Sequence, residues 1–284
     1  MKQKKIASKK FPSRRVSARV TSAALARTTT SWDAVADWYD AHLATGDTYH
    51  DRVILPNIAR LLAPTRGRPI LEIGCGEGRI ARSLEKDGHR LVACDISAEL
   101  IKKARAYEDA ISYHVAPAEK LTFAANGIFH TALAVMTLQN MERLEPVFAE
   151  VARVLSPRGR LIAVINHPAF RVPRNSSWGF DAKNNLQYRR IDKYLSAQTV
   201  SINMHPGGRQ GIEAQTTKSY HRSLQDYIKA LRAQGFALLR LEEWISDKVS
   251  EPGKRADAEN TARKEFPLFM AFEAIKIAHP GSLL

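Results

Sequence analysis

A glycine-rich turn between two acids is the segment of the sequence best equipped to bind a ligand. Residues 71–78 read Leu-Glu-Ile-Gly-Cys-Gly-Glu-Gly. Gly74, Gly76 and Gly78 allow the backbone to turn sharply and to approach a ligand without interference from a Cβ. The turn follows an apolar run and opens a helical pattern, so the free N–H groups of the helix start face the bound molecule. We therefore expect a ligand crevice at the carboxyl end of a buried strand.

The residues around this turn favour a cationic ligand over a dinucleotide. A nicotinamide-binding fingerprint needs its third glycine at the position of Arg79. That fingerprint also places a pyrophosphate at the helix N-terminus, where an acid is unfavourable. Here Glu72 and Glu77 stand on either side of the loop. Since S-adenosylmethionine carries a sulphonium and an ammonium, the sequence predicts S-adenosylmethionine as the cofactor.

A second candidate contact follows the next apolar run. Asp95 ends that run, 17 residues after Gly78. A carboxylate at this place can accept hydrogen bonds from both hydroxyls of a ribose. Ile96, the next residue, is expected to lie against an adenine ring.

These residues must be positioned by an alternation of strands and helices. Strands are expected at 69–73, 91–94, 111–115, 129–136, 161–165, 237–244 and 268–275. Helices are expected at 78–87, 98–110, 144–155 and 224–234. Strands that alternate with helices imply a parallel sheet with helices on both faces. The expected fold is a Rossmann-like, doubly wound α/β sheet.

Two of the expected helices carry sequence signals at their first residues, and one carries a clear stripe. Ser97 is expected to cap the helix that begins at residue 98. Ser223 and Asp226 have the spacing of a capping box before the helix at 224. The apolar residues of 144–155 recur with helical spacing on one face, and a turn is expected at 156–159.

Residues 166–222 interrupt this alternation. The stretch is polar, rich in arginine and aromatic residues, and has no long helical period. Long irregular insertions are more often lids or binding loops than decoration. We therefore expect one domain over residues 32–284, with 166–222 as a substrate lid inserted between the fifth strand and the following helix.

The motif series resembles the class I S-adenosylmethionine-dependent methyltransferases, and most of all the small-molecule branch that includes ubiquinone methyltransferases. The resemblance lies in residues 71–78, Asp95, 118–121 and 149–159. It covers roughly residues 32–165 and, more weakly, 217–275. It implies methyltransferase activity and a seven-stranded sheet whose last strand is antiparallel.

The resemblance also implies roles for individual residues. Glu72, Gly74 and Gly76 would contact the methionine part of the cofactor, and Asp95 its ribose. The other implied cofactor contacts are Ala118 and Glu119 near the adenine, Ile96, Met136 near the sulphur, Cys75 and Gly78 in the glycine turn, and Tyr39. Tyr39 lies in a stretch from Trp32 that resembles the helix that closes over the cofactor in that branch.

The sequence departs from this family's pattern at two places. Pro117 stands where many members have an aspartate, so a contact with the adenine amino group would need Glu119 instead. His130 stands where members often have an aspartate that is usually structural. This second change is expected to bear little on activity.

The insertion contains the candidate residues for the methyl acceptor. His167 and His221 flank it and could act as a general base, or could serve only as structural histidines. Arg171, Tyr188 and Arg222 would suit an acceptor with a flat apolar body and an anionic group. Residues 166–170 are similar to the loop of enzymes that methylate nucleobase amines. They follow the fifth strand rather than the fourth, so that specificity is not expected.

The positive charge of the chain is concentrated at its N-terminus. The net charge is +14, but residues 1–32 hold nine Lys or Arg and no acid, which leaves 34 basic against 29 acidic residues. Few large apolar residues occur in this segment, so residues 1–31 are expected to be a disordered tail. A tail that tethers RNA or a membrane, or an organelle transit peptide, are the alternatives.

Composition bounds the remaining possibilities. Cys75 and Cys94 are too few for a disulfide framework or a four-thiolate zinc site, so no metal and a cytosol-like compartment are expected. An organelle matrix is the alternative if residues 1–31 are a transit peptide. No apolar stretch approaches the roughly 20 residues of a membrane span. The expected partner is a small-molecule acceptor; the alternatives are RNA bound through the tail, and a cofactor-binding protein without catalysis.

Overall fold

The computed structural model describes residues 30–38, 40, 48–63, 67–107, 109–204 and 216–277. Tyr39 and residues 1–29 of the expected tail lie outside these ranges. Within them, no helix is long and apolar enough to cross a membrane.

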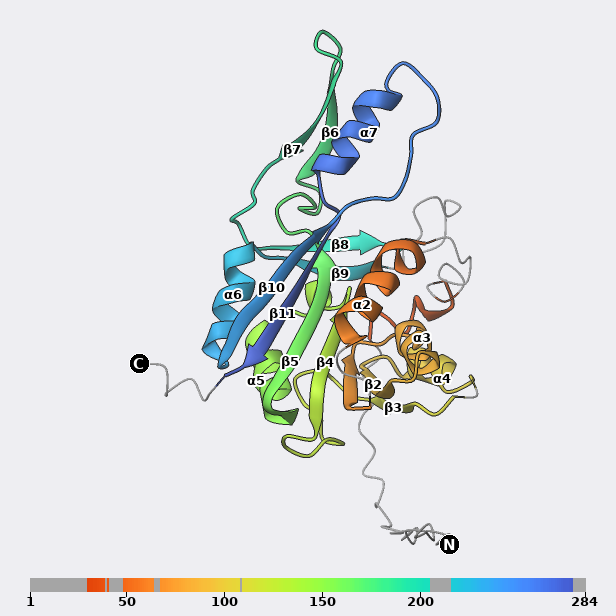
Figure 1. Ribbon diagram of the computed structural model, residues 1–284, viewed down its shortest axis with the longest axis vertical. Coiled ribbons are helices and arrows are strands. Elements are labelled where there is room, and N and C mark those ends of the chain that lie inside the picture. The colour runs from red at the N-terminus through yellow and green to blue at the C-terminus, as the bar shows by residue number, and fades with distance from the viewer. Residues whose placement is uncertain are drawn as a thin grey trace, which may run out of the picture.

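The centre of the molecule is a seven-stranded sheet with the order β10-β11-β5-β4-β1-β2-β3 (Figure 1). Its strands are β1 (Pro69–Ile73), β2 (Arg90–Asp95), β3 (Ser112–Val115), β4 (Phe129–Val135), β5 (Leu155–Asn166), β10 (Phe236–Trp244) and β11 (Phe269–Lys276). Strand β11 is antiparallel to both of its neighbours, β5 and β10, whereas the other neighbouring pairs are parallel. The expected Rossmann-like sheet with an antiparallel last strand is confirmed.

Helices cover both faces of this sheet. One core contains side chains of α2 (Leu55–Leu62), α3 (Arg79–Lys86) and α4 (Ala98–Ala104), and the other contains those of α5 (Leu144–Val154) and α6 (Leu224–Ala233). Successive side chains of a strand point to opposite faces. Accordingly Ile70 of β1 joins the first core, and Leu71 joins the second. Both faces of the strand are therefore apolar, which explains its continuous hydrophobic run.

The signals at the helix starts are confirmed, whereas two boundaries differ from expectation. Oγ of Ser97 accepts a hydrogen bond from Leu100 N, and Ser223 and Asp226 form the capping box. Helix α4 ends at Ala104, six residues earlier than expected. The expected turn at 156–159 lies within the range of β5, as a bulge at which the pairing with β4 changes register.

The helical segments before β1 and before β11 were not expected from the sequence. A π-helical turn η1 (His50–Ile54) leads into α2, and α7 (Ala256–Glu265) precedes β11. In α7 the buried residues are Ala258 and Ala262. Small side chains give no strong apolar stripe, so the helical period is hidden in the sequence.

The inserted segment is not irregular, contrary to expectation. It forms two antiparallel hairpins, β6 (Ser176–Asp181) with β7 (Leu186–Ile191), and β8 (Gln198–Asn203) with β9 (Thr216–His221). The first hairpin and α7 project together beyond the sheet, whereas β8 and β9 lie across it (Figure 1). These strands are six residues long and mostly exposed or half-buried, so their sequences carry only a weak strand signal.

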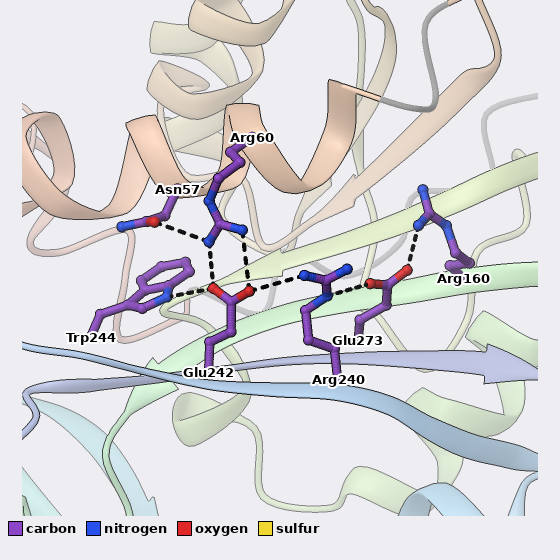
Figure 2. A network of polar contacts seen from close by, with 7 residues as sticks. All are labelled: Asn57, Arg60, Arg160, Arg240, Glu242, Trp244 and Glu273. Carbon is purple, nitrogen blue, oxygen red and sulfur yellow. Dashed lines mark hydrogen bonds and ion pairs between the residues drawn. The ribbon is translucent and has the colours of Figure 1, made fainter.

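A chain of alternating charges connects α2 to three strands of the sheet (Figure 2). Arg60 of α2 pairs with Glu242 of β10, and Arg240 lies 3.3 Å from both Glu242 and Glu273 of β11. Arg160 of β5 pairs with Glu273 as well. The hydrogen bond from Arg60 is the main influence that lowers the pKa of Glu242 to about 2. Because Arg60 and Arg240 are half exposed, each of the pairs that they form contributes at most about 1 kcal/mol. The network connects α2 to the sheet.

Candidate cofactor and acceptor site

The loop between β1 and α3 brings its backbone close to neighbouring elements. Gly74, Gly76 and Gly78 have φ angles of 65°, 57° and 82°. A Cβ on Gly74 would lie 2.1 Å from Oγ1 of Thr137, and a Cβ on Gly78 would lie 2.6 Å from the hydroxyl of Tyr113. Only glycine combines this conformation with this proximity, so the loop depends on its glycines for its shape.

Two buried acids stand beside this loop. Glu72 is 1% exposed, and its Oε2 has no hydrogen-bond partner among the described residues. Burial, followed by the neighbouring charges of Glu77 and Asp95, raises the pKa of Glu72 to about 8. Burial also raises the pKa of Glu77, whose Oε2 accepts a hydrogen bond from Arg79 N at 2.9 Å. An unpartnered carboxylate oxygen is costly to bury, and a cation placed beside Glu72 would offset that cost.

Asp95 joins the loop to the start of α4. Its Oδ2 accepts a hydrogen bond from Gly76 N, and its Oδ1 accepts one from Ser97 N, both at 2.9 Å. Burial raises the pKa of Asp95, and these backbone hydrogen bonds act in the opposite direction. A carboxylate offers about four acceptor positions. Asp95 therefore retains capacity to accept hydrogen bonds from a ligand.

A cavity of about 460 Å³ opens beside this loop, within the size range of small-molecule sites. Most of the expected cofactor residues line it: Glu72, Gly74, Cys75, Gly76, Asp95, Ile96, Ala118, Glu119 and Met136. Gly78 is not among the lining residues; it is the left-handed N-cap of α3. The ends of β1, β2 and β4 and the turn after β3 thus meet at one cavity.

Two of these lining residues have unusual local properties. Ile96 is 48% exposed although it is apolar. Met136 has a φ angle of 55°, a conformation that costs about 1–3 kcal/mol in a non-glycine residue. A hydrogen bond of 2.7 Å from Met136 N to Val164 O holds it at the end of β4. A strained backbone is common at binding sites, and Ile96 gives the cavity an exposed apolar surface.

The segment before β1 also reaches the cavity. The sequence predicted such a contact only for the stretch that begins at Trp32. Thr30, Ser31, Trp32 and His50 line it. The adjacent Asp33 accepts a hydrogen bond of 2.6 Å from Oγ of Ser97 at the start of α4. This contact attaches the N-terminal segment to the element that follows Asp95.

The second inserted hairpin supplies the wall that the sequence did not predict. Ser201 of β8 and Thr216, Lys218 and Tyr220 of β9 line the cavity. In the register of the hairpin Ser201 pairs with Lys218, and the three β9 residues occupy alternate positions. They therefore share one face of the hairpin. The alternation in residues 216–221 was the available signal, and it is obscured because the opposite face carries polar residues as well.

The structure does not bring His167 to the cavity. Its Nε2 lies 2.7 Å from Oε1 of Glu243, and its Nδ1 accepts hydrogen bonds from the backbone N–H groups of Ala169 and Phe170. Burial, the largest influence, lowers the pKa of His167. Both ring nitrogens are thus engaged, which favours the structural alternative over a general base.

His221 and Arg222 fix the base of the second hairpin and do not line the cavity. Nε2 of His221 lies 2.8 Å from the carbonyl oxygen of Tyr194, to which it donates a hydrogen bond. The guanidinium of Arg222 donates hydrogen bonds to the carbonyl oxygens of Met141, at 2.7 Å, and Glu142. The geometry gives both side chains a positioning role.

Arg171 and Tyr188 also lie away from the cavity lining. The guanidinium of Arg171 is 5.8 Å from the ring centroid of Phe269, and burial lowers its pKa. Tyr188 covers Gly179 on the first hairpin, where a Cβ would lie 2.3 Å from the tyrosine ring. Tyr188 also borders a second hollow of about 400 Å³ between β7 and α7.

The charges of the cavity fit a ligand that combines a cation with a sugar. Glu72 presents an unpartnered carboxylate oxygen, and Asp95 retains acceptor capacity at the end of β2. A pyrophosphate fits less well, because Glu77 already accepts the hydrogen bond from Arg79 N at the start of α3. The guanidinium of Arg79 is also engaged, 2.6 Å from Asp51. These are the properties expected of a site for S-adenosylmethionine.

Known proteins share both the sequence pattern and the fold. A family model described as a methyltransferase domain matches residues 71–163. N-demethylindolmycin N-methyltransferase from Streptomyces griseus is 25% identical over 75% of this chain and 90% of its own length. Demethylmenaquinone methyltransferase from Chlorobaculum parvum is 34% identical over 51% of this chain, and the match spans 60% of that relative.

A solved structure extends the comparison to the fold. An S-adenosylmethionine-dependent methyltransferase from Mesorhizobium loti superimposes with a TM-score of 0.61 at 24% identity. The superposition covers 81% of this chain and 98% of that chain. The residues that the family model matches, 71–163, contain the glycine loop, Asp95 and Met136.

Proposed function

Since the chain is a class I S-adenosylmethionine-dependent methyltransferase, we propose that it methylates a small organic molecule bound beneath hairpin β8–β9. The observation that carries this proposal is the cavity itself, with buried acids on one wall and Ser201, Lys218 and Tyr220 of the hairpin on another. A cavity of about 460 Å³ accommodates a cofactor and the reacting end of a small acceptor. It does not accommodate a folded macromolecule.

We assign the cofactor to the wall formed by the ends of β1 and β2. Glu72 would bind the cationic end of the cofactor, because its Oε2 is buried without a partner. Asp95 would accept hydrogen bonds from the ribose hydroxyls. Ile96 would lie against the adenine, since an exposed apolar side chain beside Asp95 provides a surface for a ring.

We assign catalysis to positioning rather than to a general base. S-adenosylmethionine supplies a methyl group that its sulphonium already activates. Holding a nucleophile in line with that methyl group can lower the barrier by about 7–11 kcal/mol. A general base contributes less, since it typically raises the rate by a factor of about 10²–10⁴. His167 and His221 are engaged in hydrogen bonds away from the cavity lining. The residues of this chain would therefore bind the acceptor, orient it and exclude water.

The test is a transfer experiment with two kinds of acceptor. The protein is incubated with trideuteromethyl S-adenosylmethionine and either a metabolite extract or total RNA from the source organism, and products are analysed by mass spectrometry. We expect a small molecule that gains one labelled methyl group. Label found only in RNA would overturn the proposal and favour recruitment of RNA through residues 1–31.

A binding measurement accompanies the transfer experiment. Calorimetry should show that S-adenosylhomocysteine binds, whereas NAD does not, because Glu77 occupies the N–H group at the start of α3. Micromolar binding of NAD without binding of S-adenosylhomocysteine would contradict the assignment of the cofactor site.

A further inference from the structure

Lys218 is a cation at the cavity without a charged partner among the residues that the structure describes. Arg79, which also lines the cavity, lies 2.6 Å from Asp51 and is neutralised by it. The ammonium of Lys218 has no ion-pair or hydrogen-bond partner within the part of the chain that the structure describes. Lys218 is also exposed, which places it at the mouth of the cavity. A ligand that passes this mouth meets one positive charge.

The hairpin that carries Lys218 is fixed from both of its strands. Arg222, just after β9, donates a hydrogen bond of 2.7 Å to Met141 O, and His221 bonds to Tyr194 O. On β8, the carbonyl oxygen of Ser201 accepts a hydrogen bond of 2.8 Å from Arg174. A side chain on a fixed strand loses less conformational freedom on binding than one on an unattached loop. Lys218 is therefore suited to orient a ligand.

The opposite wall restricts the charge of the ligand that Lys218 could attract. Glu72, Glu77 and Asp95 are buried acids that line the same cavity. Whichever of these acids is ionised repels a dianion such as a phosphate monoester more strongly than a single carboxylate. A single carboxylate matches the single ammonium. The hydroxyls of Ser201, opposite Lys218, and Tyr220, on the same face, can add hydrogen bonds.

We propose that Lys218 binds a carboxylate of the methyl acceptor, so that the substrate class is a small organic monocarboxylate. This inference rests on the function proposed above, because it assumes a small-molecule acceptor. It assigns to Lys218, Ser201 and Tyr220 the acceptor recognition that the sequence alone suggested for Arg171, Tyr188 and Arg222. Lys218 is a specificity residue here, with no part in moving a proton.

The experiment separates acceptor binding from cofactor binding. A metabolite extract is divided by anion exchange into retained and unretained fractions before the reaction. Each fraction is then incubated with labelled S-adenosylmethionine and the wild-type protein, Lys218→Met, Lys218→Arg or Lys229→Met. Lys229 is an exposed lysine on α6 and does not line the cavity, so its variant is the matched control. Affinities for S-adenosylhomocysteine and for methylthioadenosine, which lacks the carboxylate, are measured in parallel.

The expected result is labelled product from the retained fraction. Lys218→Met should lower kcat/KM for that acceptor by roughly tenfold or more, the low end for a hydrogen bond to a charged group. Lys218→Arg should recover part of this loss, and Lys229→Met should behave as wild type. The affinity for S-adenosylhomocysteine should be the same in all four proteins.

Three outcomes would overturn this inference. Product formed only from the unretained fraction would show an uncharged or cationic acceptor. Equal turnover by Lys218→Met and wild type would show that the lysine does not bind the acceptor. A Lys218→Met protein that binds S-adenosylhomocysteine weakly but methylthioadenosine normally would assign the lysine to the carboxylate of the cofactor. The absence of any labelled small molecule is a different result, because it contradicts the proposed function itself.

Discussion

The glycine loop and hairpin β8–β9 border the same cavity, but different forces hold them in place. The loop is fixed by its own backbone: Gly74, Gly76 and Gly78 have positive φ angles, and at Gly74 and Gly78 neighbouring side chains leave no room for a Cβ. The hairpin is fixed by side chains that reach distant carbonyl oxygens, as Arg222 does to Met141, 81 residues away. A change in the loop should therefore remove cofactor binding, whereas a change in the hairpin should alter only the acceptor.

The strongest test of this difference is the substitution Gly74→Ala. Gly74 has a φ angle of 65°, and the Cβ of an alanine would lie 2.1 Å from Oγ1 of Thr137, so the loop must move. We expect no measurable binding of S-adenosylhomocysteine in calorimetry, and a loss of stability greater than the roughly 1–2 kcal/mol that a left-handed residue costs.

Gly88→Ala is the matched control for this substitution. Gly88 has a φ angle of 87°, and no atom lies within 4 Å of its added Cβ. It should lose stability by the conformational cost alone and keep the affinity for S-adenosylhomocysteine. If Gly74→Ala and Gly88→Ala behave alike, the close contact with Thr137 does not matter to the site.

The next largest effect is expected at Asp95. Asp95→Ala removes a carboxylate that holds Gly76 N and Ser97 N and that we assign to the ribose. Loss of a charged hydrogen bond costs about 1.5–3 kcal/mol, so the dissociation constant should rise by roughly 10- to 150-fold. The dissociation constant of Asp95→Asn should lie between those of the wild-type protein and Asp95→Ala, because asparagine keeps one acceptor oxygen. An unchanged dissociation constant in both variants would remove Asp95 from the cofactor site.

A smaller effect is expected when pH is varied around the pKa of Glu72. With a pKa of about 8, Glu72 is mostly protonated at neutral pH and ionises as pH rises. A cation binds the ionised form better, so cofactor affinity should increase by about fivefold between pH 7 and pH 8, in step with the ionised fraction. Glu72→Gln should abolish this dependence. A flat profile in the wild-type protein would mean that no cation lies beside Glu72.

The same raised pKa fixes the sign of the effect on stability. The folded protein retains a proton on Glu72 that the unfolded chain releases near the ordinary pKa of a glutamate. Its contribution to stability is therefore complete at acidic pH and is lost as pH rises towards about 8. Denaturant unfolding of the cofactor-free protein should show this decline, and the decline should be smaller in Glu72→Gln.

The smallest effect on chemistry is expected at the two histidines. His167→Asn and His221→Asn each remove hydrogen bonds that lie away from the cavity lining, so stability should fall by about 1 kcal/mol. The methyl-transfer rate in single turnover at saturating acceptor should stay within a few-fold of wild type. A fall of about 10²-fold at unchanged cofactor affinity would restore the role of a general base.

The two regions also differ in how much of them could be predicted from the sequence. The wall of the cavity at the ends of β1 and β2, here called the cofactor wall, could be predicted from local signals. These are the glycines in one turn, an acid beside it, and Asp95 at the end of the next strand. The sheet could be predicted for the same reason, since strands such as β1 are apolar on both faces. These signals need no knowledge of distant contacts.

The opposite wall, formed by hairpin β8–β9, depends on contacts between residues far apart in the sequence, which sequence spacing does not encode. The place of His167 after a strand indicates a candidate base, but Glu243, 76 residues later, lies within hydrogen-bond distance of its ring. The sequence does not indicate a role for Lys218, because β9 is polar on both faces and only the structure shows which face is turned to the cavity. Helix α7 was missed because its buried residues are alanines.

The position of β11 has a consequence for the biosynthesis of the protein. Residues 269–276 pair with β5 on one side and β10 on the other, so β10 has no neighbour in the sheet until β11 is in place. A ribosome makes this strand after every other strand of the sheet. Until then the nascent chain exposes the edges of β5 and β10, and exposed edges are the sites at which chains aggregate. The strands of the cofactor wall have their neighbours much earlier, so a growing chain could hold its cofactor loop in order before its sheet is complete.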